Sequence, residues 1–490
     1  MAEAIPTSLT GKAYERFVII TTLLHLIDPV RGEPTTYSLD RHPHDDFWKH
    51  EQHQRKFLDS FALVSPTSRI GGKTASAVCL EQGHPGGTVL RLARNLGAPE
   101  ELLNQLQDIL TDLAAVSLRD KKPYDLEPVV LRKVVVLTQD KIRALVEKMN
   151  LPEVRHTIDR AIQRMDQIRS DDVEELGFRE WVRNMPFLAS LDAGTHSDQL
   201  IPHVKWASRG RWMYSEQLEG LFGLEDGSLP IWLKYVYKLG RYFAATKAML
   251  KLAVKQPDIF TGIHIEAIKA PEQEEFSLGT QKEPLLTMLK KIAPSDPIAL
   301  REKLGQTWLT TDPETKLRRA CKMTLVVHAE MQLLSFYDHH PDLTPRLLFM
   351  GTSKKACYLC NEFMSRHPLN IGVSASHQKI YPAWMSPPCH ASIRKQQKVR
   401  LWELSRHLEQ AAVRDLETRL GTRRPMTMDS TAGPSLTTTG TISSGFWSRD
   451  SNLGELETDE ESVSFITQSM KSTAVQEDGA ERQGYGIQNS

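Results

Sequence analysis

Two short apolar runs in the second half of the chain, each leading into a polar motif, constrain the fold more than any other feature. Residues 324–327 are apolar or β-branched and lead into His328, after which a helical pattern begins. Residues 347–350 lead through a short loop to a second helical pattern, from about Cys357. The order strand, helix, strand, helix is typical of α/β domains. We therefore predict an α/β fold in which the two runs are strands of a parallel strand–helix–strand unit and each polar motif stands at the beginning of a helix.

Composition and charge set broad limits on what this chain can do. Its 490 residues carry 61 Lys and Arg against 61 Asp and Glu, so no global field draws the chain to nucleic acid or to a membrane. Five cysteines are too few for a disulfide scaffold and are typical of an intracellular protein. The longest early apolar stretch, residues 17–27, is too short to span a bilayer. We therefore expect a soluble protein of the cytoplasm or the nucleus.

The sequence pattern divides the chain into four regions. Residues 1–256 show mostly helical periodicity, which is clearest in the helix predicted over residues 230–255. Residues 257–392 mix short strands with helices, and we expect them to form the α/β domain. Residues 393–421 are predicted as an amphipathic helix. Residues 422–490 are rich in Ser and Thr and carry an acidic run, so we expect a disordered tail.

The two motifs, His328-Ala329-Glu330 and Cys357-Tyr358-Leu359-Cys360, carry side chains suited to a metal ion. One imidazole and two thiolates supply three protein ligands and leave a fourth tetrahedral position open, as in catalytic zinc sites. The positive end of a helix dipole favours the thiolate form of a cysteine. We expect these His and Cys residues to bind Zn²⁺, which would lower the pKa of a bound water towards neutrality. Glu330 is then the expected proton shuttle.

The pattern H-x-E followed by C-x-x-C resembles the zinc-dependent cytidine-deaminase-like superfamily. The amino-acid sequences of three stretches are most similar to the OTT-type deaminase-like family, which is common in fungi: residues 327–334, 351–360 and 376–384. The resemblance covers about residues 258–392. It implies a mixed sheet with helices on both faces, and hydrolytic removal of an amino group from a cytosine- or adenine-type base. Ala356 departs from the superfamily pattern, which usually has proline there.

The resemblance implies zinc bound by His328, Cys357 and Cys360, with Glu330 as the acid and base residue, but it does not imply the substrate. A free base, a nucleoside, a nucleotide and a nucleic acid all remain open. Phosphate would suit two groups of basic residues, Lys354 with Lys355 and the four in 394–400, although solvated surfaces explain both equally well. Three aromatic residues could stack on a base or pack in the core: Tyr358, Tyr381 and Trp384.

A closed structural zinc site is the main rival interpretation of the cysteines. Cys357 and Cys360 could be completed to four ligands by residues that follow them, in which case His328 and Glu330 would be ordinary helix residues. The candidates are His367, His377, Cys389 and His390. The spacing fits no common zinc finger and leaves the strand-fed His328 unexplained.

Two other patterns are weaker. Residues 71–74, Gly-Gly-Lys-Thr, resemble a phosphate-binding loop but lack its first glycine and a leading strand, so we reject that interpretation. The histidines at 42, 44, 50 and 53 miss the spacing of a zinc protease motif, and we interpret them as surface residues.

A second class of function remains open beside the enzyme. In it, the deaminase-like domain is a zinc-stabilised scaffold without catalysis, and a protein partner binds through the helical region or the tail. Glu330 argues against this interpretation because a purely structural metal site needs no proton shuttle. Measurements of zinc content and of ammonia release together distinguish the enzyme from the non-catalytic scaffold.

Overall fold

The computed structural model describes residues 9–36, 46–68, 72–84, 86–167, 173–184, 196–223, 229–279 and 282–418, with Leu420. The described residues form two compact units. The first, which we call the sheet unit, contains the described residues up to 123 and those from 249 to 420. The second, which we call the helical unit, contains the described residues from 124 to 248. The predicted tail, residues 422–490, lies outside the described residues.

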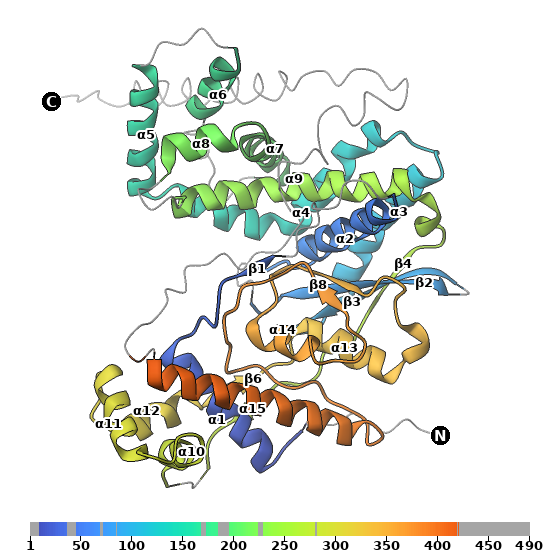
Figure 1. Ribbon diagram of the computed structural model, residues 1–490. Helices are drawn as coiled ribbons and strands as arrows, with labels where there is room; N and C mark the ends of the chain where they lie inside the picture. Colours follow the sequence, from blue (N-terminus) through green and yellow to red (C-terminus); the bar gives the residue numbers. More distant parts are fainter. Residues whose placement is uncertain are drawn as a thin grey trace, which may run out of the picture. The chain divides into compact units, whose positions relative to one another are not determined.

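A five-stranded mixed sheet in the order β4-β3-β2-β7-β8 forms the centre of the sheet unit (Figure 1). β2 runs antiparallel to both of its neighbours, whereas β3 pairs parallel with β4 and β7 pairs parallel with β8. Val78 of β2 lies between Leu92 and Gly351. The strands are β2 (Ser76–His84), β3 (Gly87–Arg94), β4 (His264–Ala267), β7 (Phe349–Thr352) and β8 (Gly372–Val373).

The central strands β2 and β3 come from the part of the chain whose pattern indicates mostly helix. Both strands are buried almost throughout, and the buried positions include Glu81, Arg91 and Arg94, so their sequences show neither an apolar run nor the alternation expected of a half-exposed strand. The turn between them also packs closely: a Cβ atom on Gly87 would lie 2.5 Å from the carbonyl oxygen of Gly262. Gly87 has φ 111°, a conformation that favours glycine.

Helices cover both faces of the sheet, which confirms the predicted layer arrangement (Figure 1). α2 (Asp46–Val64) and α3 (Glu100–Ser117) lie on one face, and α13 (Ala329–His339) and α14 (Tyr358–Met364) lie on the other. A buried ion pair between Arg91 and Glu81 links β3 to β2 at 2.8 Å. The Tyr337 hydroxyl donates to Glu81 at 2.9 Å and so fixes α13 to both strands.

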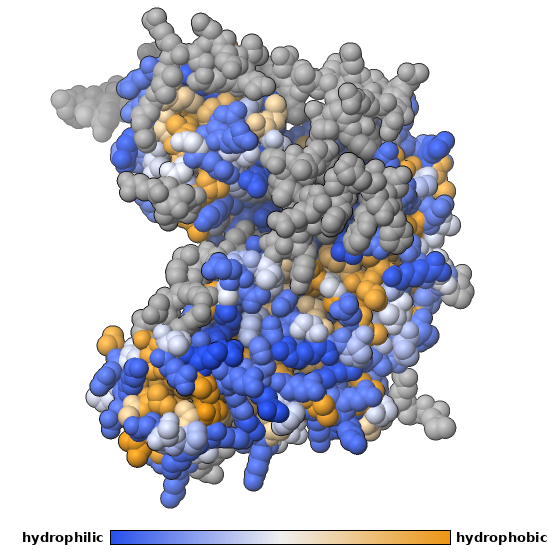
Figure 2. Space-filling model, in the orientation of Figure 1, coloured by the Kyte–Doolittle hydropathy of each residue, from blue (hydrophilic) through white to orange (hydrophobic). Residues whose placement is uncertain are grey.

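Further helices pack around this core. α15 (Arg394–Thr418) packs on α1 (Lys12–Ile27), and an Arg16–Glu409 ion pair joins them. The predicted apolar stripe of α15 is buried, whereas Figure 2 shows mostly hydrophilic residues over its outward side. The remaining helical segments of this unit are α10 (Pro284–Ile292), α11 (Pro297–Thr307), α12 (Pro313–Ala320), and the 3-10 helices η2 (Pro257–Phe260) and η3 (Pro341–Leu343).

Among the described residues, two small strand pairs lie outside the main sheet, and one of them corrects a prediction. β6 (Met323–Leu325), the strand that leads to His328, pairs with β5 (Glu274–Phe276) rather than joining β7 in a parallel strand–helix–strand unit. The next residue, Val326, also bonds away from β7: it donates to the carbonyl of Ala383 at 2.9 Å and accepts from the amide of Met385 at 2.9 Å. The second pair is β1 (Thr35–Thr36) with β9 (Ala375–Ser376).

The helical unit confirms the mostly helical character predicted for the N-terminal part. Trp181 and Trp206 stack with ring centroids 4.3 Å apart, and each indole N–H donates to the backbone carbonyl of the other residue. No described helix of either unit is both long enough and apolar enough to cross a membrane. The helices are α4 (Pro123–Met149), α5 (Pro152–Asp166), α6 (Val173–Arg183), α7 (Ser197–Met213), α8 (Ser215–Phe222) and α9 (Ile231–Lys255), the last of which continues into the sheet unit.

Candidate metal centre

Both sequence motifs stand at helix starts, as their contexts predict. His328 has an extended backbone and caps α13, where its carbonyl accepts from the amides of Met331 and Gln332. Cys357 also has an extended backbone and caps α14, and its sulfur accepts from the amide of Cys360 at 3.3 Å. Both residues are therefore placed at the N-terminal ends of their helices.

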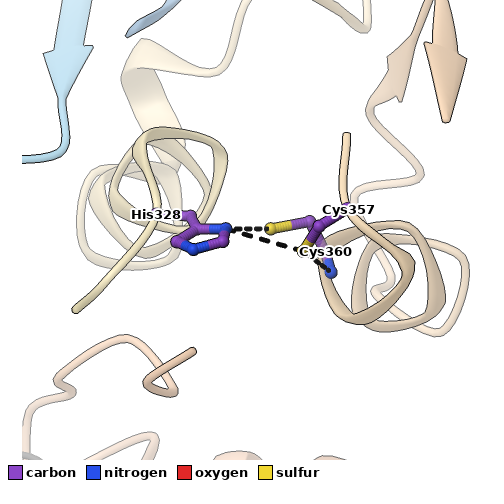
Figure 3. A group of neighbouring side chains, drawn as sticks. All are labelled: His328, Cys357 and Cys360. Carbon is purple, nitrogen blue, oxygen red and sulfur yellow. Dashed lines mark hydrogen bonds between the residues drawn. The ribbon is translucent and has the colours of Figure 1, made fainter. Parts of the chain in front are cut away.

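His328 and the two cysteines converge on one point between α13 and α14 (Figure 3). The Nδ1 atom of His328 lies 3.5 Å from the sulfur of Cys357 and 3.4 Å from that of Cys360. Their ligand atoms all lie within 4.8 Å of one another. In a tetrahedral zinc site with Zn–S of about 2.3 Å and Zn–N of about 2.05 Å, sulfur and nitrogen ligands are about 3.6 Å apart. The group therefore has the donor types and the spacing that a zinc ion requires.

The His328 side of the group is held by residues that the sequence does not single out. Asn95, which follows β3, accepts from the amide of Ala329 at 2.8 Å. The amide group of Gln332 donates to the carbonyl of Val327 at 3.0 Å and to that of Arg94 at 3.2 Å. These bonds fasten the start of α13 to the end of β3.

Backbone hydrogen bonds hold the cysteine side. Ala356 donates to the carbonyl of Ala375 at 2.9 Å, and its own carbonyl accepts from the amide of His377 at 3.1 Å. The amide of Tyr358 donates to the carbonyl of Lys379 at 2.9 Å. Proline at position 356 would lack the N–H of the first bond. Alanine at position 356 therefore allows a backbone hydrogen bond just before Cys357 that proline could not donate.

The electrostatics of the buried group favour one thiolate beside one imidazolium. Burial alone would raise the pKa of Cys357, but a hydrogen bond from Cys360 and the charge of His328 lower it well below its ordinary value. Burial and the Cys357 thiolate raise the pKa of Cys360. Burial opposes a charge on His328, yet Cys357 raises the pKa of this histidine above its ordinary value. The protonation of Cys357 and that of His328 are therefore linked.

A cavity of about 480 Å³ opens onto the metal group. His328, Cys357 and Glu330 line it together. The Glu330 side chain is buried, with 8% exposed, and burial raises the pKa of its carboxyl group. The structure therefore brings the predicted acid and base residue to the same cavity as two of the three predicted ligands.

Of the three aromatic residues considered for stacking, Tyr381 lines the cavity. Its ring centroid lies 6.2 Å from that of His328 and 5.6 Å from that of His377, which also lines the cavity. Trp384 is fully buried in the core, and the Tyr358 hydroxyl pairs with His407 at 3.0 Å. The last two residues therefore act in packing.

The closed four-ligand site does not form among the described residues. There, His328, Cys357 and Cys360 are the one group of His, Cys, Asp or Glu placed to hold a metal ion. His367 instead contacts Asp338 at 3.0 Å, and the amide of His390 donates to His339. Among the described residues, three candidate ligands are therefore grouped at this site.

The structure also locates the glycine-rich, basic and histidine-rich segments that the sequence analysis considered. Gly72 and Lys73 line the cavity, and β2 rather than a helix follows them, as our rejection of a phosphate-binding loop requires. Lys354 and Lys355 line it as well, whereas the basic residues of 394–400 begin α15, where Arg400 pairs with Asp338 at 3.1 Å. Of the clustered histidines, those at 50 and 53 lie in α2, and those at 42 and 44 are outside the described residues.

Residues 327–388 match the family model described as OTT_1508-like deaminase. The match begins just before His328 and includes both motifs and the cavity residues His377 and Tyr381. No curated protein and no solved structure matches the chain. The comparison therefore confirms the resemblance to a cytidine-deaminase-like family and identifies a deaminase-like domain over this stretch.

Proposed function

We propose that this protein is a zinc-dependent hydrolytic deaminase that acts on an amino-substituted base of the cytosine or adenine type. The main support for this proposal is structural: His328, Cys357 and Cys360 lie together beside a cavity that Glu330 also lines. This arrangement falls within the stretch that matches a deaminase family.

The donor set fits zinc. Two sulfurs and one imidazole nitrogen are ligands that zinc prefers, and three protein ligands leave one tetrahedral position for water or substrate. When bound, zinc supplies Lewis-acid activation of a water molecule. The lowered pKa of Cys357 favours the thiolate form that binds zinc, and His328 must be neutral to bind it.

Glu330 is proposed to move the protons of the reaction. Its carboxylate would accept a proton from the attacking water and deliver one to a ring nitrogen of the base. A new carbon–oxygen bond forms, the carbon–nitrogen bond breaks, and Glu330 protonates the departing amine. The products are the keto form of the base and ammonia, so the step consumes one water and needs no oxidant or reductant.

His377 is proposed to orient the base. Burial lowers the pKa of His377 to about 4, so its ring is neutral at physiological pH. Its Nδ1 accepts from the amide of Lys379 at 3.0 Å, which places the ring proton on Nε2. The Nε2–H group is therefore the donor that this ring can offer to a carbonyl or ring nitrogen of a bound base. Tyr381 supplies an aromatic surface beside it.

Ammonia release by the zinc-loaded full chain tests the proposal. The panel consists of bases, nucleosides, nucleotides and single-stranded oligonucleotides of the cytosine and adenine types. Glu330→Gln should retain one zinc per chain and lose activity by about 100-fold or more, because it cannot transfer protons. The control is Cys389→Ser, whose sulfur is buried outside the metal group and whose loss should leave activity intact.

Two results would contradict the enzymatic proposal. One is full activity of Glu330→Gln on a substrate that the wild-type chain deaminates. The other is zinc-loaded protein that releases ammonia from no member of the panel, which would favour the scaffold interpretation.

A further inference from the structure

Positive charge gathers in the more exposed part of the cavity. Lys73, Lys354 and Lys355 all line it, and Glu330 is the one carboxylate among the described lining residues. Lys73 is exposed and the other two lysines are half-buried, whereas Glu330 and Cys357 are buried. The charge is local, because the whole chain has a formal net charge of zero. The cavity therefore has a buried metal-binding end and a basic outer part.

The sheet brings these lysines together from distant parts of the sequence. Lys73 lies just before β2, and Lys354 and Lys355 lie just after β7. β2 and β7 are antiparallel neighbours with Ala77 opposite Thr352, so the start of one strand meets the end of the other.

Hydrogen bonds fix both loops in this position. The amide of Ser76 donates to the Ser353 hydroxyl at 2.9 Å, and the amide of Ser353 donates to the carbonyl of Ser76 at 3.0 Å. Asn95 donates from its side chain to the carbonyl of Gly72 at 2.9 Å, while its side-chain oxygen holds the amide of Ala329. One asparagine thus connects the Lys73 loop to the start of α13. The loops that carry the lysines are therefore held in place relative to the start of α13 and to each other.

The electrostatics agree with this placement. Burial is the main reason that the pKa of His377 is lowered; the charge of Cys357 raises it, and the charges of Lys379 and Lys354 lower it. The ammonium group of Lys354 is therefore close enough to act on groups at the metal-binding end.

We propose that Lys73, Lys354 and Lys355 form a phosphate subsite, and that the substrate is a phosphorylated nucleoside whose base occupies the metal-binding end. The proposal rests on the function proposed above for that end. Ammonium groups bind phosphate as point charges, and a cavity of about 480 Å³ is within the range of small-ligand sites. The phosphate has two sources, a free nucleotide or one unit of a single-stranded nucleic acid. A paired base would first have to leave the duplex stack.

The experiment measures equilibrium binding to the zinc-loaded full chain carrying Glu330→Gln, so that ligands are not consumed. The probes are cytidine, adenosine, their 5′-monophosphates, inorganic pyrophosphate, and single-stranded oligonucleotides containing cytosine or adenine. The test variant adds Lys73→Ala, Lys354→Ala and Lys355→Ala. The control variant adds Lys322→Ala, Lys395→Ala and Lys398→Ala, three exposed lysines outside the cavity lining, so both variants lose the same charge.

A monophosphate should bind at least about 10-fold more tightly than its nucleoside, since three ammonium contacts contribute modestly each. The test variant should lose this preference, with a larger loss of affinity for the monophosphate than for the nucleoside, while the control variant keeps it. If the source is a nucleic acid, the oligonucleotide should bind more tightly than the mononucleotide, and its affinity should fall with salt. If the source is a free nucleotide, the mononucleotide should bind at least as tightly.

Equal affinity for nucleoside and monophosphate would overturn the subsite, as would an equal loss in the test and control variants. Ammonia release from nucleosides by the wild-type chain would then leave the proposed function standing. Conversely, pyrophosphate binding that depends on the three lysines, without binding or turnover of any base-containing probe, would support the subsite and contradict the deaminase.

Discussion

At the scale of single residues, the metal group depends on a side chain that supplies no ligand atom. Asn95 accepts from the Ala329 amide and donates to the Gly72 carbonyl, so it positions the residue next to His328 and one loop of the cavity. Ligands of a metal need such support to hold their orientation. Asn95 is a positioning residue in this sense.

Replacing Asn95 tests that role. Asn95→Ala should weaken zinc affinity by about 10-fold or more, because the Ala329 amide loses its partner and His328 loses its fixed position. Asn95→Asp keeps the oxygen acceptor and should restore most of the affinity. Competition with a zinc chelator measures the effect. Unchanged affinity in Asn95→Ala would contradict the role.

Asp59 of α2 makes a pH-dependent contribution to stability. Burial raises the pKa of its carboxyl group to about 7, while one oxygen accepts from the amide of Thr352 at 3.1 Å. The native state therefore keeps a proton that the unfolded state loses above about pH 4. The free energy of unfolding should fall as the pH rises from 4 to 7, by up to about 4 kcal/mol.

Asp59→Asn isolates this contribution, because an amide resembles the protonated carboxyl group and does not ionise. The stability of Asp59→Asn relative to wild type should increase between pH 5 and pH 8, as measured by urea unfolding at each pH. A constant difference across that range would show that Asp59 is not the source of the pH dependence.

The candidate metal ligands can be predicted from the sequence, but the residues that hold them in place by hydrogen bonds cannot. His328, Glu330 and the two cysteines stand in short local patterns whose residue types have few chemical explanations. The supports, such as Asn95 and Gln332, are single amides far from the motif they hold or inside a helical run. Their role arises from the pairing of β3 with the start of α13, which no local pattern encodes.

At the scale of elements, α2 lies unusually close to β7. A Cβ atom on Gly351 would lie 2.1 Å from the carbonyl carbon of Leu58 and 2.6 Å from the amide nitrogen of Asp59. Both are backbone atoms of a helix and cannot rotate away. The glycine that follows the second apolar run therefore sets the distance between the sheet and α2.

Gly351→Ala should lower the free energy of unfolding by about 3 kcal/mol or more, since helix and strand must separate to admit the methyl group. Gly279→Ala is a matched control in the same unit, because no atom lies within 4 Å of its added Cβ. Its effect should stay within about 0.5 kcal/mol. Equal effects of the two substitutions in chemical unfolding would refute the close packing.

Helices can be predicted from the sequence where one face is exposed to solvent or where a polar motif marks the first turn. The helices that begin after His328 and Cys357 and the helix of residues 394–418 follow their periodic patterns. β2 and β3 were not predicted, because strands buried on both faces lose their alternation. The predicted pairing of the strand before His328 with β7 is wrong, because β6 pairs with β5 and the next residue, Val326, bonds to residues 383–385, contacts that no local pattern encodes.

At the scale of the whole molecule, the proposed zinc ion would join two helices through ligands that are distant in sequence. His328 precedes Cys357 by 29 residues and Cys360 by 32. The unfolded chain does not hold these atoms together, so zinc binding favours the native state. Metal content and stability are therefore coupled in this account.

X-ray absorption spectroscopy of the zinc-loaded 490-residue chain shows whether His328, Cys357 and Cys360 hold the metal. We expect one zinc per chain with two sulfur ligands, one imidazole and one further light atom from solvent. Cys357→Ser should lose a sulfur ligand or the zinc itself, and Cys389→Ser should change neither. A chain that binds no zinc, or a zinc ion held by four protein ligands, would rule out an open catalytic zinc site.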